Sequence, residues 1–109
     1  MKPVSFIIPV ILLVSALLEV GGDAVVRKGL RGSGGLTVAA GMLLLGCYGV
    51  VVNTVKWDFS KLLGVYVAVF ALTSVLAGQI LFKENIPLST WLGLGFVIAG
   101  GLVIQFGSQ

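Results

Sequence analysis

An acidic residue inside the first apolar stretch is the feature of this chain best suited to chemistry. Glu19 lies in an apolar run that begins at Val4. Asp23 and Arg27 follow at intervals of four residues, so all three fall on one stripe of a helix. Apolar surroundings disfavour the charged form of a carboxylate, and a second carboxylate nearby adds to the effect. Glu19 could therefore bind a proton near neutral pH and give it up when a cation arrives, which is the basis of proton-coupled exchange.

Both acids also have a purely structural interpretation. Glu19 could hydrogen-bond to a neighbouring helix, and Arg27 could neutralise Asp23 at the membrane interface. Acids within membrane spans are rare without a role. This favours a functional Glu19, whereas Asp23, closer to a loop and to a basic residue, fits the structural interpretation better.

Two tyrosines are candidates to bind a cation beside Glu19. Tyr48 and Tyr66 lie in later apolar stretches. An aromatic face attracts cations, and a hydroxyl could bond to Glu19. Packing or interfacial roles are equally open for both. The chain has no histidine and a single cysteine, so we expect no metal site, no cofactor and no enzymatic activity.

The composition predicts an all-α membrane protein. Hydrophobic residues make up 58% of the chain and charged residues only 10%, against about a quarter in soluble domains. A span needs roughly 20 apolar residues. Four transmembrane helices per protomer are expected within a single domain, 1–109, at about 4–26, 36–55, 62–82 and 89–106. The first is expected to be retained, with a cleaved signal peptide as the minor alternative.

Loop charges show almost no preferred orientation. With four spans, one face carries three basic residues, namely Lys2, Lys56 and Lys61. The opposite face carries four, namely Arg27, Lys28, Arg31 and Lys83. Basic residues favour the cytoplasmic side, so a balanced chain could insert both ways and form an antiparallel dimer. Alternatively, the first-loop cluster fixes one orientation. A dimer is expected in either case, since four helices hardly enclose a path alone.

A glycine-rich segment, GLGFVIAGG, lies in the fourth span. Gly93 and Gly100 are seven residues apart and share a helix face, which permits close helix approach. We expect a helix-packing face there, between molecules. A phosphate-binding loop would need a strand-to-helix context and a Lys-Ser/Thr ending, which the segment lacks.

These segments resemble the small multidrug resistance family of the drug/metabolite transporter superfamily. In LLEVGGDAVVRKG, Glu19, Gly22 and Arg27 match the family's first helix, and Gly93 and Gly100 match its fourth-helix glycine heptad. The third helix departs from the family: Tyr66, Ala68 and Phe70 stand in place of a tryptophan and a Gly-x-Gly hinge. The chain thus resembles a divergent member. The resemblance implies an antiparallel dimer joined through the fourth helices, in the inner membrane of a bacterial or archaeal cell.

The function expected from these features is proton-coupled transport, the export of a small cationic or amphipathic compound through Glu19. The alternatives are a subunit that translocates lipid-linked sugars or polar lipids, and a membrane assembly protein without transport. The expected partners are a small-molecule substrate, protons, the lipid bilayer and a second copy of the chain, or else a paralogue. Nothing in the sequence resembles a nucleic-acid-binding patch.

Overall fold

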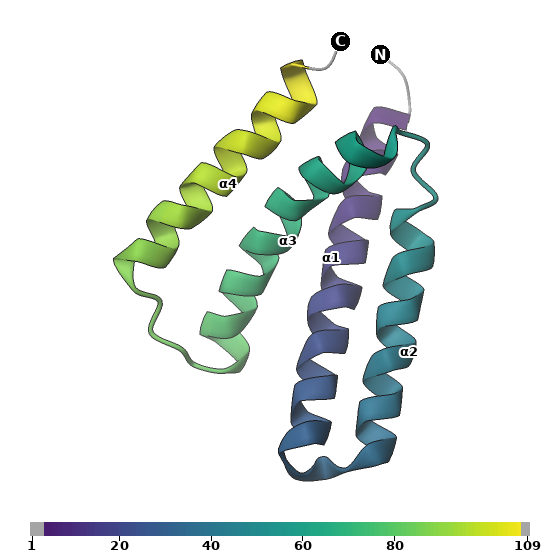
Figure 1. The fold of residues 1–109 in the computed structure, drawn as a ribbon, viewed down its shortest axis with the longest axis vertical. Helices are drawn as coiled ribbons and strands as arrows, with labels where there is room; N and C mark the ends of the chain where they lie inside the picture. Colours follow the sequence, from purple (N-terminus) through teal and green to yellow (C-terminus); the bar gives the residue numbers. More distant parts are fainter. Residues whose placement is uncertain (1–3, 108–109) are drawn as a thin grey trace. The chain divides into compact units, whose positions relative to one another are not determined.

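Helices account for all regular secondary structure in residues 4–107, the part of the chain that a computed structural model describes. In chain order the elements are α1 (Val4–Lys28), the π-helical turn η1 (Gly29–Ser33), α2 (Gly35–Val52), α3 (Phe59–Leu81) and α4 (Leu88–Gly107) (Figure 1). The four α-helices are long and apolar enough to cross a membrane. The prediction of an all-α protein with four transmembrane helices is therefore confirmed.

The first predicted loop is only partly helical, because Arg31 and Gly32 have non-helical backbone angles. α1 continues to Lys28, and η1 adds a wide turn in which the Gly34 N–H donates to the Gly29 carbonyl at 3.0 Å. The chain then reverses through positive φ angles of 143° at Gly32 and 97° at Gly34, which glycine adopts without a steric penalty. The sequence prediction ended the helix too early because the glycines of this segment were interpreted as loop residues.

The second helix is shorter than predicted. α2 ends at Val52 and not at Val55. The Asn53 side-chain amide and the Thr54 hydroxyl each donate to a backbone carbonyl three or four residues earlier, at 2.7 and 2.6 Å. These side-chain bonds add to the backbone N–H bonds that the Gly49 and Val51 carbonyls also accept at the helix end. Both side chains thus bond to the backbone at the end of α2.

The third helix begins earlier than predicted. α3 starts at Phe59, whereas the apolar pattern placed its start near Leu62. The Asp58 carbonyl accepts the Leu62 N–H at 2.9 Å and so closes the first turn. Ser60 and Lys61, which the sequence assigned to a polar joint, therefore belong to the first turn of α3. Polar residues are common at helix starts, so the apolar pattern alone misses that turn.

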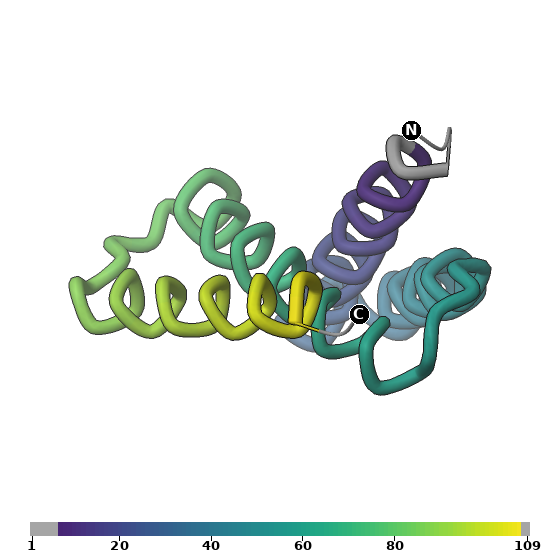
Figure 2. Tube along the Cα trace, turned by 90° about the horizontal axis from the view of Figure 1, so that it is seen from above, coloured from purple at the N-terminus to yellow at the C-terminus, as the bar shows by residue number. Residues whose placement is uncertain are grey.

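The chain forms two compact helical hairpins, residues 4–56 and 57–107 of the described part. α1 packs against α2 in the first, and α3 packs against α4 in the second. The connection between α3 and α4 lies at one end of their hairpin (Figure 2). Each hairpin joins helices of opposite direction, as expected for consecutive membrane spans with short connections.

Large apolar side chains lie on the outside of both hairpins. Leu36 and Leu43 of α2 are 90% and 71% exposed, and Phe96 of α4 is 80% exposed. Soluble proteins rarely present apolar surface on this scale. Lipid acyl chains are the solvent that such helices require, in agreement with their length and composition.

Candidate functional site

Two glycines bring α1 and α2 into close contact. A Cβ atom added at Gly41 would lie 2.7 Å from the Val26 nitrogen and 2.8 Å from the Gly22 carbonyl oxygen. One added at Gly22 would lie 2.9 Å from Leu45 Cγ. These distances are too short for any side chain, so the two backbones touch only because both residues are glycine.

Three contacts define the register of this antiparallel helix pair. They join residues spaced by three and four along each helix: Gly29 with Val38, Val26 with Gly41, and Gly22 with Leu45. The next step of the same register places Glu19 of α1 opposite Tyr48 of α2. Tyr48 interacts electrostatically with both Glu19 and Asp23, in agreement with this placement. The structure thus brings together three of the four predicted ion-site residues.

Glu19 lies near the middle of a membrane span. The span covers Ile7–Ser33, and Glu19 is half-buried on it. One turn earlier, the Ser15 hydroxyl is fully buried and donates to the Ile11 carbonyl at 2.7 Å. Ser15 therefore already uses its donor within the helix, and Tyr48 is the polar side chain that α2 presents at the level of Glu19.

Asp23 and Arg27 are closer to the end of α1. Both side chains are exposed. Asp23 precedes the last residue of α1, Lys28, by five residues, or about 8 Å of helix rise. Asp23 thus lies closer to the interface than Glu19. The two interpretations of Asp23, as a companion of Arg27 and as a member of the ion site, both stay predictions.

Tyr66 belongs to the second hairpin. It is buried in α3, only 3% exposed, and its ring centroid lies 6.2 Å from that of Phe70 at a tilt of 31°. This arrangement is favourable for an aromatic pair. It gives both Phe70 and Tyr66 a packing role within α3. The proposed bond between Tyr66 and Glu19 stays a prediction.

The predicted glycine face of α4 points away from α3. Gly93 and Gly100 are exposed, and a Cβ at either would meet nothing within 4 Å. The neighbouring Gly101, which the sequence did not single out, faces α3: a Cβ there would lie 2.7 Å from Ala68 Cβ. Gly93 and Gly100 therefore remain open to contact another molecule, as the sequence prediction requires.

Gly41 and Leu45 are the contributors to the site that the sequence interpretation missed. Their signal was present in α2, where Val38, Gly41, Leu45 and Tyr48 are spaced by three, four and three residues. This spacing is hard to recognise because the whole of α2 is hydrophobic. The sequence alone does not distinguish a leucine that faces lipid from one that faces α1. Within residues 4–107 the structure also contains no cluster of His, Cys, Asp and Glu suited to a metal ion.

These features define the class of the protein. Four apolar spanning helices, with an acid near the middle of the first, make the chain an integral membrane protein. The chain is 34% identical over 94 residues to a UPF0060 membrane protein of Nocardia farcinica (strain IFM 10152), an alignment covering 84% of this chain and 85% of the relative. The chain belongs to the UPF0060 membrane protein family. No protein-family model and no solved structure matches it.

Proposed function

We propose that this protein is a proton-coupled transporter that exports a small cationic or amphipathic compound, with Glu19 as the shared binding site for proton and substrate. The observation that carries the proposal is the position of Glu19. Glu19 is half-buried near the middle of a membrane span and faces Tyr48 of α2. The two helices are held close together beside it, at Gly22 and Gly41, where there is no room for side chains.

The exchange follows from the cost of a negative charge in apolar surroundings. Without substrate, a proton neutralises the Glu19 carboxylate and removes that cost. A cationic substrate neutralises the same carboxylate, so binding of the cation releases the proton. The proton and the cation bind the same carboxylate oxygens of Glu19. The protein therefore carries one of them across the membrane only in exchange for the other.

Tyr48 supports the cation in this mechanism. Its ring can present a π-face to an organic cation, and its hydroxyl can donate to the carboxylate when the substrate is absent. Asp23 adds negative charge on the same stripe and lies closer to the interface, where it attracts cations toward Glu19.

The working unit in this proposal is a dimer. The exposed glycine face at Gly93 and Gly100 permits a second copy to approach α4 closely, and the balanced loop charges allow that copy to insert in the opposite direction. Two copies would supply two Glu19 side chains.

The experiment compares wild type with Glu19→Gln in liposomes that carry an imposed pH gradient. A panel of small primary, quaternary and guanidinium cations is tested for proton-driven flux. Flux that is present in wild type and lost in Glu19→Gln is expected. Glu84→Gln is the matched control, because Glu84 is an exposed acid after the end of α3.

Two outcomes would contradict the proposal. The first is the absence of flux for every cation, with correctly folded protein in the membrane. The second is an equal loss of flux in Glu19→Gln and Glu84→Gln. Labelling of the η1 turn from both sides of the membrane tests the opposite orientations separately.

A further inference from the structure

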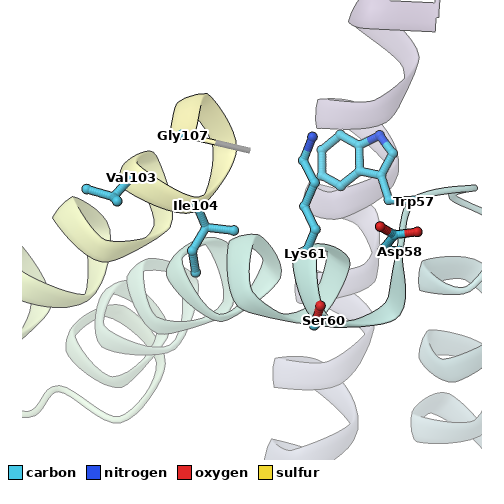
Figure 3. Close-up of a pocket in the computed structure, with 7 residues that line it drawn as sticks. All are labelled: Trp57, Asp58, Ser60, Lys61, Val103, Ile104 and Gly107. Carbon is cyan, nitrogen blue, oxygen red and sulfur yellow. The ribbon is translucent and has the colours of Figure 1, made fainter. Parts of the chain in front are cut away.

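A cavity of about 750 Å³ opens at one end of the second hairpin (Figure 3). The residues that form it come from the segment that begins α3 and from the last turns of α4: Trp57, Asp58, Ser60, Lys61, Val103, Ile104 and Gly107. It is separate from the Glu19 site, which lies in the first hairpin. One wall is polar and charged, and the other is apolar.

Lys61 supplies a positive charge at a defined position in this cavity. Its ammonium nitrogen lies 4.6 Å from the centre of the Trp57 ring, the geometry of a cation–π contact. In Figure 3 the lysine side chain extends alongside the indole. The ring restricts the ammonium without neutralising it, because a π-face carries no net charge. The ammonium therefore remains available to an anionic group.

Asp58 supplies a negative charge in the same cavity. It is the residue that precedes the first turn of α3, where an aspartate side chain usually accepts a backbone N–H. Here the side chain makes no such bond, and it is exposed. A carboxylate that does not cap its own helix is available to an external donor.

The level of the cavity in the membrane and its apolar wall indicate that the ligand is an amphiphile. The start of α3 and the end of α4 mark the end of two membrane spans, the level at which lipid headgroups and interfacial tryptophans lie. Val103 and Ile104 of α4 extend the apolar wall toward the hydrocarbon region. A molecule that fits both walls has a charged head and an apolar tail.

We propose that this cavity binds a phospholipid whose headgroup carries both a phosphate and a primary ammonium, such as phosphatidylethanolamine. The phosphate binds the Lys61 ammonium, the lipid ammonium donates to the Asp58 carboxylate, and the acyl chains lie along Val103 and Ile104. Asp58 repels a purely anionic headgroup. A choline headgroup has no N–H to donate to Asp58, so it forms the weaker complex.

The test places the purified chain in nanodiscs with equal amounts of phosphatidylethanolamine, phosphatidylcholine and phosphatidylglycerol. Native mass spectrometry after release counts the lipids that stay bound. Wild type is expected to retain phosphatidylethanolamine about fivefold over the other two, the effect of one favourable exposed ion pair. Asp58→Asn is expected to abolish the preference over phosphatidylglycerol, and Lys61→Gln to reduce retention of all three.

Controls separate this site from general lipid contact. Lys56→Gln also removes a lysine charge, but Lys56 lies before α3 and does not line the cavity. This variant should leave the lipid preference unchanged. Lys61→Arg keeps the positive charge and should retain the lipid preference. A loss of retention in Lys61→Gln but not in Lys61→Arg is then due to the charge and not to a folding defect. Equal retention of all three lipids by wild type overturns the proposal. An unchanged preference in Asp58→Asn, or unchanged lipid retention in Lys61→Gln, overturns it too.

Discussion

Gly41 of α2 lies against the backbone of Gly22 of α1, so closely that a methyl group at Gly41 would sit 2.8 Å from the Gly22 carbonyl oxygen. Gly22 is three residues from Glu19, which is less than one helical turn. The spacing of the two helices at the candidate site is thus set by residues without side chains. The first prediction follows from this contact.

Gly41→Ala is expected to destabilise the first hairpin by about 1–3 kcal/mol, the usual cost of inserting a methyl group into a packed contact. The methyl group would meet the backbone nitrogen of Val26, which cannot rotate away. Helicity followed by circular dichroism during an SDS titration measures the loss. Gly46→Ala on the same helix is the control, because a Cβ there meets nothing within 4 Å. Equal stability of the two variants would contradict the close contact.

Gly34→Ala is expected to cost about 1–3 kcal/mol of stability through backbone strain alone. Gly34 has φ 97° and ψ −176°, a conformation that alanine adopts only with difficulty. Gly35→Ala is the matched control, since neither glycine has a neighbour within 4 Å and only Gly34 has a positive φ. The same SDS titration measures both variants. A larger loss in Gly35→Ala than in Gly34→Ala would show that the turn has a different backbone.

Substitutions at Tyr48 separate the roles of its ring and its hydroxyl. If the ring face holds the cation, Tyr48→Phe should change the substrate KM by less than about threefold, whereas Tyr48→Leu should raise it about tenfold, within the range of a partly desolvated cation–π contact. Liposome flux measures both. Cys47→Leu, one position away and exposed, is the control. An equal effect of the phenylalanine and leucine variants would assign the role of Tyr48 to its hydroxyl.

Adjacent glycines of α4 should have different effects. Gly101→Ala is expected to loosen the α3–α4 hairpin, because its methyl group would lie 2.7 Å from Ala68 Cβ. Gly100→Ala should leave the hairpin intact and weaken association of two copies, since Gly100 faces outward. Thermal unfolding measures the first effect, and the dilution dependence of single-molecule FRET between labelled copies measures the second. A dimer that is unaffected by Gly100→Ala argues against this face.

Much of the fold could be predicted from composition and periodicity. Four apolar runs of span length predict four helices, because a backbone in lipid must satisfy its own hydrogen bonds. The predicted spans agree with α1–α4 to within a few residues at each end. The errors fall where polar residues continue a helix, at the last turn of α1 and at the first turn of α3. Hydropathy measures transfer into lipid and carries no information about where a helical hydrogen-bond pattern stops.

The sequence by itself singled out Glu19 as the candidate functional acid, because the cost of a carboxylate in an apolar helix depends on residue type and position alone. Only the tertiary structure showed that Tyr48 lies on the face of α2 that packs against α1 at the level of Glu19. Tyr48 and Tyr66 are equivalent in the sequence, yet the Gly22–Gly41 contact sets a register that places Tyr48 beside Glu19, while Tyr66 packs on Phe70 in the other hairpin. The same holds for Gly100 and Gly101. Adjacent residues on a helix point about 100° apart, so which of them meets a neighbour is determined by how the helices pack.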